Sequence, residues 1–323
     1  MSQAEAARLT MGKATRDAFG EALRDLGRER PEIVVVDGDV SNSTRTEWFG
    51  KEFPDRFFNC GIAESNMVGV AAGLAAGGKV PFCASFAAFL LCNAFDQLRM
   101  SVAFPRLNVK LVGSHAGISI GEDGPSQMAI EDIALALALP GMTVVVPADE
   151  HSTRDAVRAL ADLNGPAYLR VGRPNVPIVY DGPGNFTLGK ANTLRQGADL
   201  TIVACGLMVA VALEAAAVLA GDGVQARVLD MHTVRPLDEV ALLAAASETG
   251  AIVVAEEHLT SGGLASQVAL VLAQHRPTPL RVVGLSTYAE SGKPQELLDK
   301  YGLTSEAVAT AARAVLAARG NRG

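Results

Sequence analysis

Short apolar runs alternate with helical segments along most of this chain, and this alternation restricts the fold more than any other feature. The runs at 32–36, 79–85 and 108–113 are continuous and have the length of strands buried on both faces. Alternation of strand and helix implies right-handed crossovers and a mostly parallel sheet. The sequence therefore predicts the α/β class, with mostly parallel sheets flanked by helices.

The pattern divides into two predicted domains, which suits a length of 323 residues at roughly 150 residues per domain. Residues 174–184 carry three prolines and two glycines and are typical of a linker. We expect a first domain over residues 1–185 and a second over 190–323, with the boundary near Gly189. The predicted helices are 12–30, 129–139, 150–163, 207–220, 237–248, 262–275 and 304–319, and the further strands are 143–146, 166–171, 200–204, 225–229, 251–255 and 280–284.

Composition and charge exclude several kinds of partner. Hydrophobic residues make up 49% of the chain and charged residues 20%, so the chain can bury substantial cores. The net charge of −7 argues against nucleic acid or an anionic membrane as the main partner. No apolar run reaches the length of a membrane span, and residues 1–10 lack the apolar core of a signal peptide.

The cysteines give a prediction about the cellular compartment. Cys60, Cys83, Cys92 and Cys205 lie in apolar contexts and lack CxxC spacing. Such residues are typical of reduced core thiols, rather than of metal ligands or a disulfide framework. We therefore expect a cytoplasmic protein.

Glu64 belongs to the stretch with the first candidate chemistry. Residues 57–67 predict a short strand, a turn at Gly61 and a helix with Glu64 in its first turn. The small residues that follow, up to Gly78, allow this helix to approach a neighbouring helix or a ligand closely. A carboxylate at a helix start is commonly explained by its favourable interaction with the helix dipole. From spacing alone, this ordinary explanation is favoured over a functional one.

Polar residues follow the predicted strand at 32–36, at the kind of strand end where open α/β sheets bind ligands. The sequence Asp37-Gly38-Asp39 is a weak signal for a metal or a diphosphate, because no further ligand is marked nearby. The residues at 42–44 are expected to cap the next helix.

The loop at 114–128 is a stronger candidate, because it is long, rich in glycine and placed between a buried strand and a helix. His115 at the strand end is a candidate ligand or proton-handling group. Asp123 is either a polar anchor for a substrate or a solvated turn acid. Phe86 and Phe89, three residues apart at a helix start, either face one pocket or are ordinary core aromatics.

Four motifs taken together resemble the pyrimidine-binding domain of transketolase, a thiamine-diphosphate enzyme. They are RFFNCGIAESNM at 56–67, PFCASFAAF at 81–89, AFDQLRM at 94–100 and GSHAGISIGEDGPSQMAIEDIA at 113–134. The resemblance continues from about Lys13 through TVRPLD, EEHLTSGG and SGKPQELL in the second half of the chain. It covers nearly the whole chain, but only the second half of a conventional transketolase. With Gln127 where many microbial members carry histidine, the loop resembles the animal-type enzymes.

The resemblance implies a role for each candidate residue. Glu64 would hydrogen-bond the aminopyrimidine of thiamine diphosphate and promote loss of the proton from its thiazolium C2. Aromatic rings would pack against the pyrimidine, and two arginines with a hydroxyl would hold the substrate phosphate. The implied catalytic residues are Glu64 and His115; the cofactor contacts are Glu64, Phe86, Phe89 and Asp39; the substrate contacts are Arg16, Ser43, His115, Asp123, Gln127 and Arg173. Of the neighbouring Arg170 and Arg173, one is expected to be structural.

The family's diphosphate- and magnesium-binding domain, with its GDG…N motif, is absent from this sequence. We interpret the chain, which starts naturally at Met1, as the C-terminal subunit of a split transketolase. It would transfer a two-carbon ketol unit from a ketose phosphate to an aldose, in the pentose phosphate pathway or another route of carbohydrate metabolism. A partner subunit would complete the sites for thiamine diphosphate and Mg²⁺, within an α2β2 heterotetramer in which this chain pairs with itself. No metal ligands are predicted in this chain, and it should be inactive alone.

Two other functions remain open at this point. The beta subunit of a 2-oxo acid dehydrogenase decarboxylase component has similar length and architecture, but the GEDGPSQM loop and the set Arg16, Ser43 and Arg173 favour a phosphorylated sugar. A non-catalytic paralogue with a regulatory or scaffold role would not need Glu64, His115 and Asp123 together.

Overall fold

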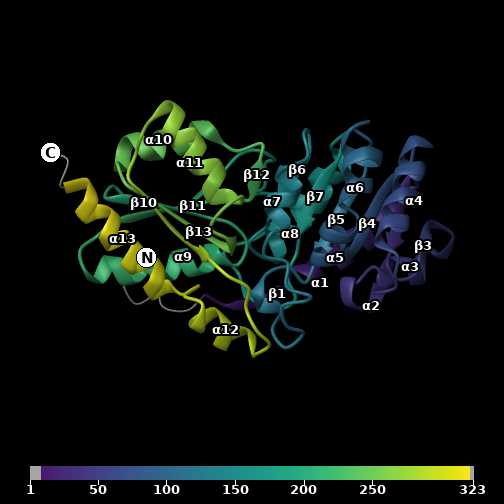
Figure 1. Ribbon diagram of the computed structural model, residues 1–323, viewed down its shortest axis with the longest axis horizontal. Helices are drawn as coiled ribbons and strands as arrows, with labels where there is room; N and C mark the ends of the chain where they lie inside the picture. The colour runs from purple at the N-terminus through teal and green to yellow at the C-terminus, as the bar shows by residue number, and fades with distance from the viewer. Residues whose placement is uncertain (1–8, 321–323) are drawn as a thin grey trace.

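The computed structural model describes residues 9–320, which form two lobes side by side (Figure 1). Residues 1–8, which include most of the segment assessed for a signal peptide and the start of the predicted first domain, lie outside the described range. So do residues 321–323 at the end of the predicted second domain. Each lobe has a mostly parallel sheet with helices on both faces, which confirms the predicted fold class.

The N-terminal lobe contains a seven-stranded sheet in the order β12-β6-β7-β5-β4-β2-β3. All neighbours are parallel except β12 and β6. The strands are β2 (Ile33–Asp37), β3 (Phe57–Asn59), β4 (Val80–Phe86), β5 (Lys110–Ser114), β6 (Thr143–Val145), β7 (Ala167–Arg170) and β12 (Thr233–Arg235). Because the central strands are parallel, their carboxyl ends meet at one edge of the sheet.

Helices cover both faces of this sheet because its strands are apolar on both sides. In β2, Val35 packs in the cluster with Phe19 of α1, whereas Val36 packs in the cluster with Met67 of α4. The helices and helical turns are α1 (Thr15–Glu29), α2 (Ser41–Thr44), α3 (Glu47–Glu52), a 3₁₀ turn (Pro54–Arg56), α4 (Glu64–Ala76), α5 (Ala87–Asn93), α6 (Phe95–Gln97), a π-helix (Leu98–Ala103), a second 3₁₀ turn (Ile118–Ile120), α7 (Asp132–Leu137) and α8 (Glu150–Asp162).

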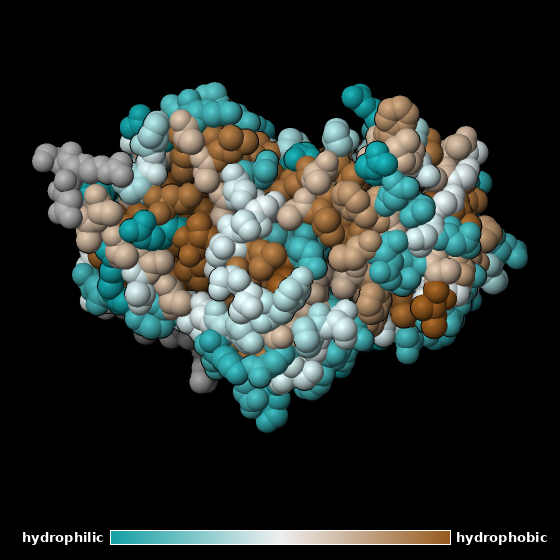
Figure 2. All heavy atoms as spheres, in the orientation of Figure 1, coloured by the Kyte–Doolittle hydropathy of each residue, from teal (hydrophilic) through white to brown (hydrophobic). Residues whose placement is uncertain are grey.

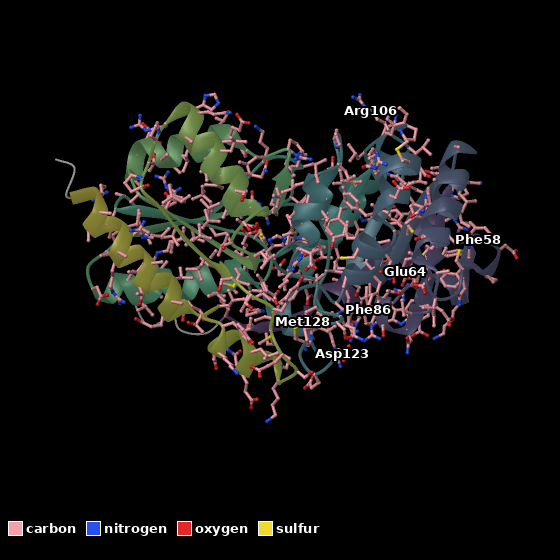
Figure 3. The ribbon with its side chains drawn as sticks, in the orientation of Figure 1. Phe58, Glu64, Phe86, Arg106, Asp123 and Met128 are labelled. Atoms are coloured by element: carbon pink, nitrogen blue, oxygen red, sulfur yellow. The ribbon has the colours of Figure 1, made fainter. Side chains whose placement is uncertain are left out.

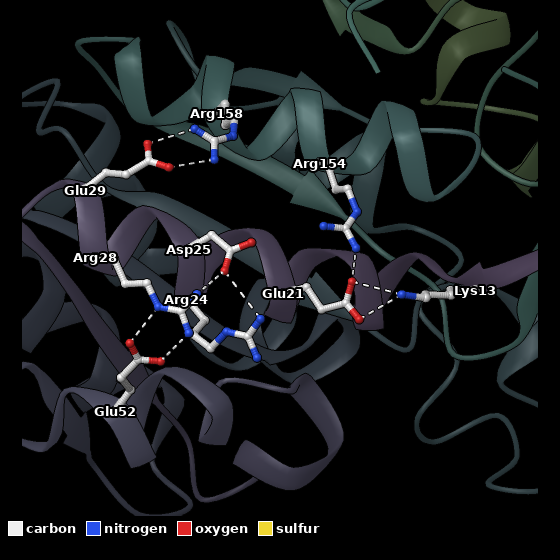
Figure 4. Close-up of polar contacts among 9 residues, drawn as sticks. All are labelled: Lys13, Glu21, Arg24, Asp25, Arg28, Glu29, Glu52, Arg154 and Arg158. Carbon is white, nitrogen blue, oxygen red and sulfur yellow. Dashed lines mark hydrogen bonds and ion pairs between the residues drawn. The ribbon is translucent and has the colours of Figure 1, made fainter. Parts of the chain in front are cut away.

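Ion pairs on the surface add to the apolar packing of α1 against α8 and α3 (Figure 4). Arg158 and Glu29 join α8 to α1, and Arg28 and Glu52 join α1 to α3 over 2.7 Å. Such exposed pairs stabilise a fold by about 0–1 kcal/mol each, so the buried apolar contacts contribute most of the stability.

The C-terminal lobe contains a five-stranded sheet in the order β14-β13-β10-β11-β9, of which only β9 is antiparallel. Its strands are β9 (Asn192–Arg195), β10 (Leu200–Ala204), β11 (Ala226–Asp230), β13 (Ile252–Leu259) and β14 (Leu280–Leu285). Its helices are α9 (Met208–Gly221), α10 (Glu239–Thr249), α11 (Leu264–His275), α12 (Pro294–Lys300) and α13 (Ser305–Gly320).

The two lobes share structure more closely than the sequence predicted. One buried apolar cluster contains Met67 of α4 together with Leu242 of α10 and Leu264 of α11. Strand β12 comes from the second half of the chain, yet it pairs with β6 at the edge of the N-terminal sheet. The sequence did not predict β12, because three residues carry no usable periodicity.

The predicted helix at 12–30 was wrong at its start. Residues 11–14 form the short strand β1 (Met11–Ala14), which pairs with β8 (Asn175–Pro177) inside the predicted linker. Helix α1 begins only at Thr15, whose hydroxyl accepts a hydrogen bond from the amide of Gly172 over 2.7 Å. The pairing is non-local, and for this reason helical spacing misjudged the boundary.

Three further expectations need correction. The helix predicted at 129–139 is shortened to Asp132–Leu137. Residues 42–44 cap no helix, because they are themselves part of the short helix α2. The hydroxyl of Thr44 donates instead to Asp37 Oδ2 over 2.9 Å. The cysteines are free, but Cys92 is exposed and Cys60 is half-buried, so these two are not core thiols.

Candidate functional site

The predicted site residues lie near the carboxyl edge of the N-terminal sheet, on loops and on the first turns of helices. Glu64 follows β3, Phe86 ends β4 and His115 follows β5. Figure 3 labels Glu64, Phe86 and Asp123 along the lower side of this lobe. The parallel strands bring these residues to one edge although they are up to 59 positions apart in the chain.

Glu64 is the first residue of α4 and is only 7% exposed. Its Oε1 accepts a hydrogen bond from the hydroxyl of Ser85 over 3.3 Å. Ser85 in turn lies against Gly38, where an added Cβ would come within 3.3 Å of the Ser85 hydroxyl. A carboxylate that served only to interact with the helix dipole would gain nothing from being buried. The buried position of Glu64 therefore indicates a further role.

Three rings stack at the ends of β4 and β5, shortly after Ser85 and Ser114 in the chain. Phe86 and Phe89 have centroids 5.9 Å apart and planes within 7°, and the His115 ring stacks on Phe86 at 4.0 Å. Phe86 and Phe89 are half-buried, so neither is an ordinary core aromatic. The arrangement offers a flat apolar surface at the same edge of the sheet as Glu64.

His115 is a neutral imidazole with an assignable tautomer. Arg16 Nη1 lies 2.8 Å from His115 Nε2, and a guanidinium can only donate, so Nε2 accepts. The proton therefore lies on Nδ1, which donates to the Ser114 hydroxyl over 2.7 Å. Burial, followed by the charges of Arg16, Arg173 and Arg45, lowers the pKa of His115 to about 3.

Arg16 links this ring to the loop after β2. Its Nη1 donates to the backbone carbonyl of Ser43 over 3.1 Å. Its Nε is buried without an acceptor among the described residues. Burial and the nearby charge of Arg45 lower the pKa of Arg16, although a guanidinium stays charged at neutral pH. An anion placed here would relieve both the missing acceptor and the repulsion between the two arginines.

The two neighbouring arginines have different surroundings, as the sequence led us to expect. Arg170 is buried and donates from Nε to Asp132 over 2.8 Å. Arg173 is 37% exposed and donates from Nη1 to Asp123 over 3.0 Å and to the carbonyl of Ile120 over 3.1 Å. Arg173 therefore faces the loop of candidate residues, whereas Arg170 is part of the core.

The remaining candidates lie at the rim of the site. Gln127 is half-buried on the same loop as Asp123, and its Oε1 accepts from the Ser126 hydroxyl. Asp39 is exposed, has a positive φ of 66° and accepts from the Asn59 side chain over 2.8 Å.

Asp37 organises a loop rather than holding a ligand. Its oxygens accept from the amide of Val40 and from the hydroxyls of Thr44 and Thr46, over 2.7 to 2.9 Å. Burial raises its pKa, and these hydrogen bonds oppose that rise. Within residues 9–320, no group of three or more His, Cys, Asp or Glu side chains is arranged to hold a metal ion.

Comparison with known proteins assigns both lobes. Residues 11–179 match the family "Transketolase, pyrimidine binding domain", and residues 189–308 match "Transketolase, C-terminal domain". The chain belongs to the transketolase family. Thiamine diphosphate is the cofactor that membership of this family implies.

The relatives show which part of a transketolase this chain represents. Human transketolase is 41% identical over 307 residues, which cover 94% of this chain but only 49% of the human protein. A 6-deoxy-6-sulfo-D-fructose transketolase subunit from Clostridium sp. (strain MSTE9) is 43% identical and is covered over 94% of its length. A solved split-gene transketolase, described as an inactive beta4 tetramer, has a TM-score of 0.88 and 48% identity over 95% of this chain and 99% of its own.

This chain therefore corresponds to the C-terminal half of the single-chain enzymes, as the motifs predicted. Its two domains and its relatives are those of transketolases, so the 2-oxo acid dehydrogenase alternative is not favoured. Within residues 9–320, no helix has the length and apolar character needed to cross a membrane.

Sequence reasoning missed three residues of the candidate site. Ser85 and Ser114 orient Glu64 and His115, and Arg45 adds its charge near His115. The only signal for the serines was their position at strand ends. Arg45 has a positive φ of 68° and donates to Asp17 over 2.6 Å, which no local pattern indicated.

Proposed function

We propose that this chain is the C-terminal subunit of a split transketolase and transfers a two-carbon ketol unit from a ketose phosphate to an aldose. The observation that carries the proposal is that the buried Glu64, the stacked aromatic rings and a cluster of arginines share one edge of the sheet. The acid and the flat rings suit the cofactor, and the arginines suit a substrate phosphate; the proposed reaction needs both at one edge. The two predicted domains, at 1–185 and 190–323, would be the units of this subunit.

The residues present fit the aminopyrimidine half of thiamine diphosphate. Phe86 and Phe89 offer a face for a flat ring, and Glu64 offers an acceptor in a place with little water. Bound thiamine diphosphate would supply the thiazolium carbon that attacks the ketose carbonyl. Glu64 would hold a proton on the ring nitrogen, and Ser85 would fix the orientation of the carboxylate. Asp39 would approach the cofactor from the rim.

The substrate's anionic end would lie among Arg16, His115, Ser43 and Arg173. Arg16 has an unused Nε, and Arg173 can exchange its exposed partner Asp123 for a phosphate oxygen. Asp123, His115 and Gln127 would then contact the polar groups of the sugar. The Clostridium relative is a subunit for a sulfonated sugar, whose anionic group has a similar tetrahedral shape.

A partner subunit with the GDG…N motif would complete the cofactor site and hold Mg²⁺ with the diphosphate. The surface supports a covering partner: Ile62 before α4 is 83% exposed, and Met100 of the π-helix that contacts α4 and Phe104 directly after it are also exposed. Apolar side chains reach the displayed surface in both lobes (Figure 2). We infer an α2β2 assembly in the cytoplasm, in which this chain also pairs with itself.

Reconstitution tests this proposal directly. The purified chain, supplied with thiamine diphosphate and Mg²⁺, should not consume a ketose phosphate, because half a cofactor site cannot hold the cofactor in reactive geometry. Adding an N-terminal transketolase subunit should produce ketol transfer. Turnover by the isolated chain would refute the split site, and no transfer with any such partner would refute the function.

A further inference from the structure

The loop that carries His115, Asp123 and Gln127 is held from the C-terminal lobe at two places. Near its base, the amide of Ser119 donates to Glu257 Oε1 over 2.7 Å. Near its tip, the start of α12 packs so closely that a Cβ on Gly121 would come within 2.9 Å of Pro294 Cδ. The residues that hold the loop, Glu257 and Pro294, belong to the C-terminal lobe, whereas the predicted site residues lie in the N-terminal lobe.

Glu257 is directed at the loop by the alternation of side chains in β13. Its neighbour Glu256 points to the other side, where its two oxygens accept from the amides of Leu264 and Ala265 over 2.8 Å at the start of α11. Both carboxylates are buried, at 4% exposure for Glu257 and 0% for Glu256. The two residues are therefore both buried glutamates that accept from backbone amides, but the amides belong to different segments.

The Glu257 carboxylate is buried close to a cation, whose charge opposes the rise in the pKa of this acid that burial causes. Arg170 Nη1 lies 3.8 Å from its Oε2, and Arg170 Nη2 donates to its backbone carbonyl over 2.9 Å. Arg170 is held in turn by Asp132. An ionised acceptor away from water makes a stronger hydrogen bond to an amide than a neutral acceptor does.

The loop sequence is adapted to this carboxylate. Gly117 has a φ of 86°, and a Cβ at this position would overlap the Glu257 carboxylate. Only glycine adopts such a backbone conformation freely and leaves room for the acid. The bond at Ser119 and the space at Gly117 thus place Glu257 against the start of the 3₁₀ turn that follows His115.

We propose that Glu257 is a positioning residue, through which the C-terminal lobe sets the geometry of the substrate loop by holding the Ser119 amide. The inference rests on the function proposed above for that loop's site. It gives the C-terminal lobe a task in substrate binding, although none of the predicted site residues comes from it.

Hydrogen exchange of the purified chain tests the structural half without any assay of activity. In Glu257→Met, amides over 115–128 should exchange roughly ten- to a hundredfold faster, the scale for losing a hydrogen bond to a charged group. Glu257→Gln keeps an acceptor and should restore protection. Glu256→Met, the matched control, should accelerate exchange at the start of α11 but not in the loop.

The inference is overturned if Glu256→Met loosens the loop as much as Glu257→Met does, or if the loop is unchanged in both. It is also overturned if Glu257→Gln fails to restore protection, because the ion pair with Arg170 would then be the cause. If Glu257→Met does not fold, Glu257→Asp decides: it keeps the charge but shortens the side chain, and it should still accelerate exchange in the loop.

Kinetics of the complex reconstituted with an N-terminal subunit test the functional half. Glu257→Met should raise the KM for a ketose phosphate about tenfold or more, with a smaller effect on kcat and none on C2 proton exchange of thiamine diphosphate. Glu257→Gln should restore the KM. Equal losses in KM, kcat and C2 exchange would indicate general damage and refute positioning. If the wild-type complex transfers no ketol unit, the proposed function fails, while the exchange experiment still decides whether Glu257 holds the loop.

Discussion

Arg170 and Arg173 lie three positions apart, and their replacement should separate stability from substrate recognition. Arg173→Ala removes an ion pair whose side chains are 37% and 34% exposed, and one hydrogen bond to a backbone carbonyl. Exposed ion pairs contribute about 0–1 kcal/mol and such a hydrogen bond about 1 kcal/mol, so unfolding should become easier by only about 1–2 kcal/mol. Arg170→Met instead leaves the buried Asp132 and Glu257 without their cation, which typically costs about 3–5 kcal/mol.

The kinetic effect of Arg173→Ala should be large and selective. Losing a charged contact to phosphate costs about 1.5–3 kcal/mol, which is roughly ten- to a hundredfold in kcat/KM. Phosphate lies away from the reacting carbonyl, so its binding energy acts by positioning the substrate. An unphosphorylated analogue makes no such contact, and Asp123, which would be left beside solvent, can still meet its hydroxyl groups.

The assay compares kcat/KM for a ketose phosphate and its unphosphorylated analogue in the reconstituted complex, with thermal unfolding of each variant measured in parallel. We expect Arg173→Ala to lose the phosphorylated substrate selectively with nearly unchanged unfolding. Arg170→Met should unfold at clearly lower temperature. If Arg173→Ala affects both substrates equally, or neither, the phosphate site lies elsewhere or the natural substrate carries no phosphate.

Single substitutions or titrations at three other buried groups test the chemistry and the electrostatics. Glu64→Gln keeps the shape but removes the carboxylate, so C2 proton exchange of thiamine diphosphate in the complex should slow by at least ~10²-fold by NMR; near-normal exchange would leave Glu64 only its helix-start role. His115 should carry its proton on Nδ1 across about pH 5–8 in ¹⁵N spectra, and an Nε2-bound proton would contradict the Arg16 contact. Because its folded pKa of about 3 lies below the unfolded 6.5, this residue should lower stability as pH falls below about 6.5. Burial raises the pKa of Asp230 to about 7. The protonated carboxyl therefore stabilises the folded state at low pH, and this stabilisation is lost as pH rises through about 7. Asp230→Asn should raise Tm at about pH 8 but not at about pH 4.

The parts of the fold that the sequence predicted are those with a local cause. Strands such as β2 and β10 are continuous apolar runs, and each is followed by a helix or a polar loop. Strands β1, β8 and β12 are three or four residues long and exist because of pairing with distant segments. No pattern within such a short segment distinguishes it from a turn, so the helix start at 12 and the first residues of the linker predicted at 174–184 were misjudged.

The candidate site divides in the same way. Motifs identified the side chains, and in the structure Arg16 contacts His115 and the Ser43 carbonyl, while His115 stacks on Phe86. Their roles stay predictions. The hydrogen-bond partners of these side chains were not predictable from the sequence. The Arg16 contact fixes the tautomer of His115, and this depends on two segments 99 positions apart. Spacing therefore indicated where the candidate residues are concentrated, but not the protonation state of His115.

Asp37 has a structural task that the sequence did not indicate. The Asp-Gly-Asp sequence was only a weak signal for a ligand, and in the structure the buried Asp37 holds the loop that brings the Ser43 carbonyl to Arg16. Glu257 acts in the same manner on the loop that carries His115 and Asp123, because it too accepts a hydrogen bond from a loop amide. Loops alone would be mobile, and a site made of loops needs fixed points to reach the geometry that binding requires. Two buried acids, each at the carboxyl end of a strand, provide these points. An acid at a strand end in such a fold can thus hold a loop as well as bind a ligand, and its burial and donors distinguish the two.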